Sequence, residues 1–215
     1  MIINLILLFS INTLATPLKV AVLDTGLDLR YSKFTNLCKS EHKDFTGEGF
    51  NDTIGHGSNV IGLITENAQS INYCIVLIKV YSKDLKKSHI TEGLEYAYDI
   101  KANIINLSGG GFGIINREKD IVEKILNANI TFITAAGNQR SNLDKTCNYY
   151  PACYDKRIYV IGNYSISSNY GQIVDAVING QNKTAFGINL SGTSQSAAIF
   201  TGKLIKTIAK IEEAL

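Results

Sequence analysis

The chain has 215 residues, of which 45% are hydrophobic and 19% charged, a balance that suits one globular domain with a sizeable core. Its net charge of +2 gives no reason to expect a nucleic-acid partner or an acidic membrane surface. The two prolines, Pro17 and Pro151, form no proline-rich linker, so nothing divides the chain.

The N-terminus has the pattern of an export signal. Residues 2–14 are almost wholly apolar, yet too few to cross a bilayer, which takes about 20 residues. Thr13 and Ala15 are small residues at the spacing that a signal peptidase reads. We therefore expect a signal peptide over 1–15 and one domain over 16–215, secreted or periplasmic, with no stable membrane span after cleavage. A buried first strand or an interfacial anchor is the alternative.

The four cysteines fit an exported protein, in which disulfides survive. Cys147 and Cys153 could close a small loop, which would leave Cys38 and Cys74 as the other pair. Four cysteines allow three pairings, and four buried free thiols are also compatible with the sequence. None has the CxxC spacing typical of a metal site, and we expect no metal and no cofactor.

Short apolar runs alternate with helical patterns along the chain. Strands are predicted at 19–23, 72–80, 102–107, 130–135 and 157–161, and helices at 90–100, 120–128 and 194–214. Buried strands separated by helices favour a three-layer α/β/α fold with a mostly parallel, doubly wound sheet.

Polar residues follow directly on three of these strands. They are Asp24, the segment Ser108 to Gly111, and Asn138. Because ligands bind at the carboxyl ends of parallel strands, these residues are predicted to meet at one edge of the sheet.

His56 stands between Gly55 and Gly57, ahead of an apolar run that predicts a helix. Flanking glycines let an imidazole approach a substrate closely, as a general base must. Asp24 could orient that imidazole and stabilise its cation. The alternatives are a loop histidine and an aspartate that opens a turn.

Ser194 lies in a glycine-bearing turn before the last helix, whose N-terminus favours developing negative charge. It could equally be an ordinary N-cap serine. Asn138 follows a strand, where its amide could donate to an oxyanion, or it could be a left-handed turn residue.

Taken in order, these stretches resemble the subtilisin-like serine peptidases, or subtilases, across nearly the whole chain after the proposed signal. The matching stretches are 20–26 (VAVLDTG), 55–58 (GHGS), 105–108 (INLS), 135–138 (AAGN) and 191–197 (SGTSQSA). The order Asp, His, Ser is the one that subtilisin uses.

The resemblance implies a role for each matching residue. Ser194 would be the nucleophile, His56 the general base and acid, and Asp24 the group that orients His56. Asn138 and the backbone N–H of Ser194 would bind the oxyanion. The implied activity is a serine endopeptidase that acts on protein or peptide substrates.

The resemblance also implies a substrate cleft. Its candidate residues are Ser108, Gly109 and Gly110 on one wall, Ala135, Ala136 and Gly137 around the primary specificity pocket, and Tyr149 at the pocket floor. If the Tyr149 ring points inward, small or medium apolar residues would be preferred before the cut.

Three features depart from the family pattern. Asn59 stands where the family has a second histidine, and Gln195 where it often has methionine after the serine. The sequence also lacks the propeptide of many secreted relatives, so we expect a minimal catalytic domain that folds unaided or with an inhibitor or chaperone in trans.

The sequence can be compared with the patterns of three other functions. An α/β-hydrolase esterase would need G-x-S-x-G and the order Ser, Asp, His, and Ser196 occupies the required second glycine position. A catalytically silent binding protein with this fold and a peptide ligase that uses the same acyl-enzyme both remain compatible with the sequence.

Overall fold

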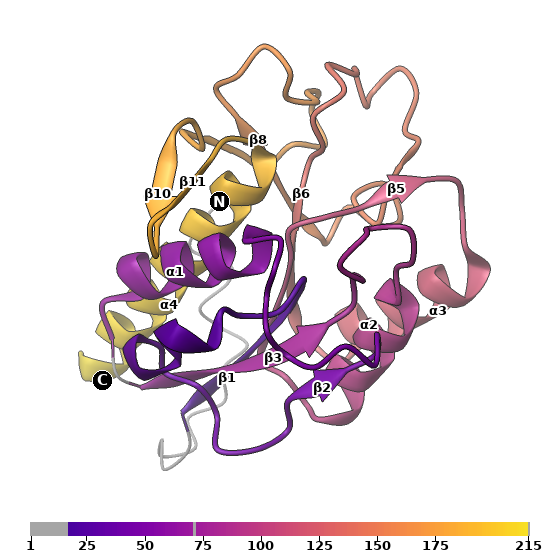
Figure 1. Ribbon diagram of the computed structural model, residues 1–215. Helices are drawn as coiled ribbons and strands as arrows, with labels where there is room; N and C mark the ends of the chain where they lie inside the picture. The colour runs from indigo at the N-terminus through magenta and orange to yellow at the C-terminus, as the bar shows by residue number, and fades with distance from the viewer. Residues whose placement is uncertain (1–16, 71, 215) are drawn as a thin grey trace.

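The computed structural model describes residues 17–70 and 72–214, apart from the side chain at position 213, and centres on a seven-stranded parallel sheet (Figure 1). The order across the sheet is β2-β3-β1-β4-β6-β8-β9. The strands are β1 (Leu18–Asp24), β2 (Lys43–Asp44), β3 (Tyr73–Lys79), β4 (Ile104–Leu107), β6 (Thr131–Ala135), β8 (Tyr159–Asn163) and β9 (Ala176–Ile178). The chain winds outward from β1 in both directions, so the switch point lies between β1 and β4.

Helices cover both faces of the sheet. Helices α1 (His56–Ala68) and α4 (Thr193–Glu213) lie on one side, and α2 (Ile90–Asp99) and α3 (Asn116–Asn127) on the other (Figure 1). This arrangement confirms the predicted three-layer α/β/α fold.

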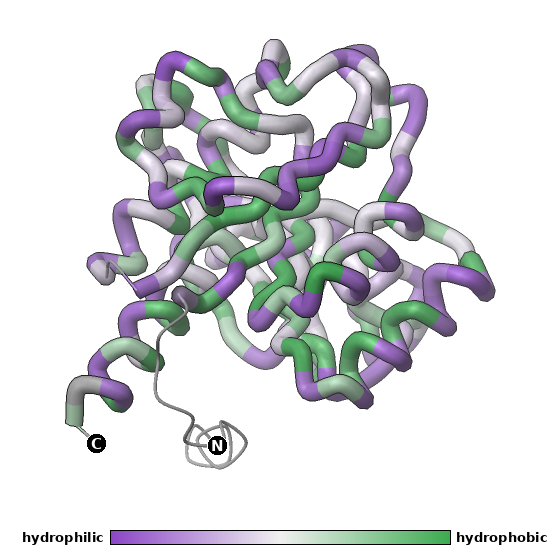
Figure 2. Tube along the Cα trace, turned by 90° about the horizontal axis from the view of Figure 1, so that it is seen from below, coloured by the Kyte–Doolittle hydropathy of each residue, from purple (hydrophilic) through white to green (hydrophobic). Residues whose placement is uncertain are grey.

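Strand β1 shows why the sheet has two cores. Successive side chains of a strand point to opposite faces. Val20 and Val22 accordingly pack with α1 and α4, whereas Ala21 and Leu23 pack on the side of α2 and α3. A parallel strand buried on both faces needs such a continuous apolar run. Figure 2 shows hydrophobic positions concentrated along the central strands, whereas hydrophobic and hydrophilic positions alternate along the helices.

The sequence prediction missed the shortest elements. These are the edge strands β2 and β9 of the main sheet, an antiparallel pair β5 (Gly111–Phe112) and β7 (Tyr149–Tyr150), and a hairpin of β10 (Lys183–Ala185) and β11 (Ile188–Leu190). A 3₁₀ helix (Leu29–Phe34) was missed as well. Elements of two or three residues are too short to show a hydrophobic period. Helix α3 also begins four residues before its predicted start, because Glu118 belongs to a buried face that the charged segment conceals.

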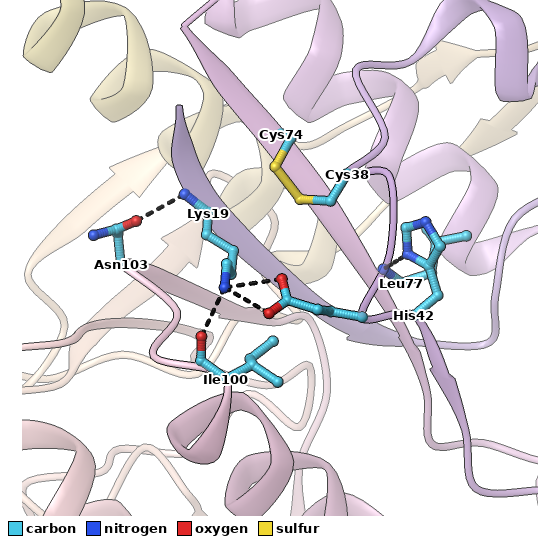
Figure 3. Close-up of a disulfide and its surroundings, with 8 residues drawn as sticks. Lys19, Cys38, His42, Cys74, Leu77, Ile100 and Asn103 are labelled. Carbon is cyan, nitrogen blue, oxygen red and sulfur yellow. Dashed lines mark hydrogen bonds and ion pairs between the residues drawn. A yellow bond between two sulfur atoms is a disulfide. The ribbon is translucent and has the colours of Figure 1, made fainter. Parts of the chain in front are cut away.

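The four cysteines form two disulfides, Cys38–Cys74 and Cys147–Cys153. The first ties the segment before β2 to β3, beside the ion pair of Lys19 with Glu41 (Figure 3). The predicted signal peptide lies outside the described residues. Within the ranges that the structure covers, no helix is both long and apolar enough to cross a membrane.

His42 lies in the same region and links stability to pH. Its Nδ1 accepts a hydrogen bond of 3.1 Å from the backbone N–H of Leu77 (Figure 3). Burial lowers the pKa of His42, although a backbone hydrogen bond at Cys38 and the charge of Glu41 act in the opposite direction. The folded state therefore favours the neutral imidazole.

We expect acid to destabilise the protein through His42. Below about pH 6.5, the ordinary histidine pKa, the unfolded state takes up a proton that the folded state resists. Stability is thus complete above this pH and falls as the pH drops toward the folded pKa. In urea unfolding at pH 7.5 and 5.0, His42→Gln should lose less stability on acidification than the wild type. Equal losses in both proteins would contradict this assignment.

Candidate active site

The end of β1 and the start of α1 bring Asp24 and His56 together. Nδ1 of His56 lies 2.7 Å from Oδ1 of Asp24. A β-carbon at Gly57 would clash with the carbonyl oxygen of Gly26 and lie 3.1 Å from Asp24 Oδ1. Glycine at position 57 therefore allows the helix to begin against the strand end.

The electrostatics favour a positive charge on His56. Burial alone would lower its pKa, but the charge of Asp24, the hydrogen bond to it and the charge of Asp52 outweigh burial and raise the pKa above the ordinary value. Asp24 is 1% exposed, and its Oδ2 accepts no hydrogen bond from the described part of the chain. A buried carboxylate with so few donors interacts strongly with an adjacent imidazolium.

Ser194 lies in the first turn of α4 and contacts the segment after β4. Its Oγ donates to the carbonyl oxygen of Ser108 at 2.8 Å, and the Ser108 hydroxyl donates to the carbonyl oxygen of Ser194 at 3.1 Å. Ser108 Oγ also accepts from Asn106 Nδ2 at 3.0 Å. The Ser194 hydroxyl must therefore rotate away from Ser108 before it can donate to an imidazole.

Asn138 lies after β6 and is held against the same helix start. Its Oδ1 accepts from the backbone N–H of Thr193 at 3.1 Å, and Thr193 Oγ1 accepts from the N–H of Gly137 at 3.2 Å. The amide oxygen of Asn138 thus accepts a bond from the helix start, and its amide nitrogen, Nδ2, is the donor of this side chain. The N–H of Ser194 belongs to the first turn of a helix, where backbone donors have no partner within the helix.

Two of the residues predicted to form the pocket, Gly110 and Gly137, lie against Tyr149. A β-carbon at Gly110 would lie 2.9 Å from Cε1 of Tyr149, and one at Gly137 would lie 2.9 Å from its Cζ. The ring thus lies close to Gly110, the last residue of the segment 108–110, and to Gly137, the last residue of the segment 135–137. Tyr149 is 7% exposed, and burial raises its pKa to about 12.

Two residues that matter here were not singled out from the sequence. Asp52 and Thr25 are buried and hydrogen-bonded to each other at 3.0 Å, and both contact the segment around His56. The N-cap residue of α1 is Gly55, so the usual N-cap pattern gave no signal for Asp52.

Asn59 and Gln195, the two substitutions that depart from the family pattern, are hydrogen-bonded to each other. Nε2 of Gln195 donates to Oδ1 of Asn59 at 3.0 Å, and both side chains are buried. Asn59 Nδ2 donates in turn to the carbonyl oxygens of Lys183 and Ile188. This contact joins the first turn of α1, which carries His56, to the first turn of α4, and joins both to the β10–β11 hairpin.

We expect Asn59 and Gln195 to be energetically coupled. Each of Asn59→Leu and Gln195→Met leaves buried polar groups unpaired and should cost about 1–3 kcal/mol of unfolding free energy. The double variant should lose less than the sum of the two by about 0.5–3 kcal/mol. Urea unfolding of the four proteins, each with Ser194→Ala to prevent self-digestion, measures the coupling. Additive losses would show that the two amides act independently.

Two solved structures share this fold at low sequence identity. A lanthipeptide protease aligns with a TM-score of 0.77 at 19% identity, covering 92% of this chain and 74% of that one. A mutant of the protease domain of PatA aligns with a TM-score of 0.75 at 19% identity, covering 94% and 84%. These similarities support the fold.

Two bacterial relatives are similar in sequence. The major intracellular serine protease of Bacillus subtilis (strain 168) is 29% identical over 87% of this chain and 67% of its own length. The intracellular serine protease of Paenibacillus polymyxa is 32% identical over 92% and 69%.

Both names contradict the predicted secreted or periplasmic location, which is therefore corrected. The stretch at 2–14 lacks the basic residues that open a signal peptide, so its hydrophobicity was a poor guide.

A profile of the subtilase family matches residues 16–213, nearly the whole chain. The match covers the sheet, the four helices and every candidate residue described above. The chain therefore belongs to the subtilase family of serine peptidases.

Proposed function

We propose that this protein is an active serine endopeptidase that cleaves peptide bonds through an acyl-enzyme formed on Ser194. The observation that carries the proposal is the 2.7 Å hydrogen bond between His56 and the buried Asp24. This bond fixes Nδ1 as the protonated nitrogen, which leaves Nε2 free to accept a proton.

In the proposed reaction, the Ser194 hydroxyl turns from Ser108 to His56 and attacks the scissile carbonyl carbon. His56 Nε2 takes the hydroxyl proton, and the carbonyl oxygen becomes an oxyanion that Asn138 Nδ2 and the Ser194 N–H stabilise. As the C–N bond breaks, His56 returns the proton to the leaving amine. Water then attacks the ester by the same route and releases the acid and Ser194.

The proposal is tested by labelling with a fluorophosphonate, which bonds to an activated serine with loss of fluoride. Intact mass should show one adduct on the wild type and none on Ser194→Ala. Ser191→Ala is the matched control, because Ser191 is an exposed serine three residues away that should not affect labelling. A folded wild type without an adduct would overturn the proposal in favour of a silent binding protein. Product masses that show joined peptides would indicate ligation instead of hydrolysis.

We further propose that Tyr149 restricts the residue before the cut to small or medium apolar side chains. The ring occupies the space between Gly110 and Gly137, where the side chain of a bound substrate would enter. It also packs edge-on against Phe112, with ring centroids 6.1 Å apart. The β5–β7 pair and the Cys147–Cys153 disulfide brace the segment that carries it.

Tyr149→Ala should therefore open the pocket to larger residues. We expect the ratio of kcat/KM for a peptide with phenylalanine before the cut to that with alanine to rise about 100-fold. Tyr150→Ala is the matched control, because the half-buried neighbour lies in the same disulfide loop. Fluorophosphonate labelling confirms that each variant is folded. A ratio that changes less than about twofold in Tyr149→Ala would contradict the proposal that the Tyr149 ring limits the size of the residue before the cut.

A further inference from the structure

Asp52 is a buried carboxylate that the reaction proposed above does not use. It lies between β2 and α1 and is 6% exposed. Its oxygens accept five hydrogen bonds of 2.7–3.0 Å, from Thr25 Oγ1, Ile54 N, Gly55 N, Ser58 N and Ser58 Oγ. A carboxylate with this many donors is rigidly held.

These bonds connect the residue after Asp24 to residues on both sides of His56. Thr25 donates to Asp52 through Oγ1, and the same oxygen accepts the N–H of Gly57 at 2.9 Å. The Thr25 N–H also donates to Asp24 Oδ1 at 2.8 Å, the oxygen that binds His56. Asp52 therefore links the strand end that carries Asp24 to the helix start that carries His56.

The position of Asp52 also matters electrostatically. His56 is the first residue of α1, and the partial positive charge of a helix N-terminus disfavours an imidazolium there. The charge of Asp52, bonded to N–H groups of that same terminus, opposes this effect. Glu66, the next carboxylate along α1, lies about 15 Å further along the helix axis.

Several other groups surround this region. The charged or titratable groups are Asp24 on β1, Asp28 with its exposed partner Arg30, Lys79 at the end of β3 with its partner Glu48, and Tyr81 beyond β3. The uncharged contacts are Gln195 of α4 against Asn59, and Ile188 of β11 against Gly55. Unlike the other anions named here, Asp52 accepts hydrogen bonds from backbone N–H groups at the start of α1, the helix that begins with His56.

We propose that Asp52 is a positioning residue that locks the start of α1 onto the end of β1 and whose negative charge stabilises the imidazolium of His56 during the reaction. The inference rests on the proposed function of His56. It adds a second carboxylate to the one that contacts the imidazole directly.

The test is an NMR titration of the histidine side chains in protein that carries Ser194→Ala, which requires no activity. Asp52→Asn should lower the pKa of His56 by about 0.5, because it removes a neighbouring negative charge. The pKa of His42 should not move. Asp44→Asn is the matched control. Asp44 also accepts several hydrogen bonds, but they come from the loop residues Thr46 and Gly49 and not from α1.

An unchanged His56 pKa in folded Asp52→Asn would overturn the inference. If that variant does not fold, Asp52→Glu keeps the charge while altering the hydrogen bonds. Its His56 pKa should stay near the wild-type value, and a drop matching that expected for the asparagine variant would overturn the electrostatic role.

In protein with Ser194 intact, Asp52→Asn should lower kcat about 10-fold or more with little change in KM, and should move the acidic limb of kcat/KM to lower pH. An unchanged kcat and acidic limb in this variant would contradict the positioning role. Failure of the wild type to label with fluorophosphonate would instead refute the proposed function, and the titration would still report on Asp52.

Discussion

Replacing Ser194 by alanine should lower kcat by about 10⁶-fold while leaving KM nearly unchanged. The magnitude is the one known for subtilisin, to whose family this chain belongs. Without the hydroxyl no acyl-enzyme can form, and any residual rate comes from oxyanion stabilisation and substrate positioning. The expected effect is the largest because the nucleophile has no substitute in the proposed reaction.

The measurement is the hydrolysis of a chromogenic peptide under single-turnover and steady-state conditions. Ser191→Ala, prepared in the same way, should keep its activity within about twofold, as exposed positions usually do. Ser194→Ala protein that retained more than about 1% of the wild-type rate would show that another residue supplies the nucleophile.

Asp24→Asn should lower kcat by about 10⁴-fold near neutral pH. This is the loss found when the equivalent exchange is made in a serine protease of the chymotrypsin type. An amide at this position can donate to Nδ1, which places the imidazole proton on Nε2 and removes the base that Ser194 needs. It also removes the charge that raises the His56 pKa, so the acidic limb of kcat/KM should move to lower pH.

The matched control for this variant is Asp28→Asn. Asp28 lies four residues further along the chain and accepts hydrogen bonds from the exposed Arg30. Its replacement should change kcat less than about twofold. Equal losses in the two variants would indicate that general destabilisation, rather than the His56 contact, causes the effect.

The strands and helices were largely readable because burial imposes simple periods. The runs at 19–23, 102–107 and 130–135 are mostly apolar, the pattern typical of a parallel strand covered on both faces. The polar residues that end them, Asp24, Ser108 and Asn138, could be placed at one edge from strand direction alone. Elements of two or three residues carry no such period and were missed.

Contacts between distant segments were not readable from the sequence. Asn59 and Gln195 are 136 residues apart and appear in the sequence as two separate departures from the family pattern, yet the structure joins them by one buried hydrogen bond. Four of the five donors on Asp52 are local, from residues 54–58, but the fifth, Thr25 Oγ1, reaches it only when the chain after β1 meets the start of α1.

The sequence by itself determined the layered parallel fold and the identities of the candidate site residues, because these follow from hydrophobic period and local motifs. Only the tertiary structure decided that the Tyr149 ring fills the space between Gly110 and Gly137 and that Ser194 rests on Ser108. Such contacts form or fail with differences of a few ångströms in the spacing between helices and strands. That separation is decided by how the two cores pack against the sheet, which no local pattern encodes.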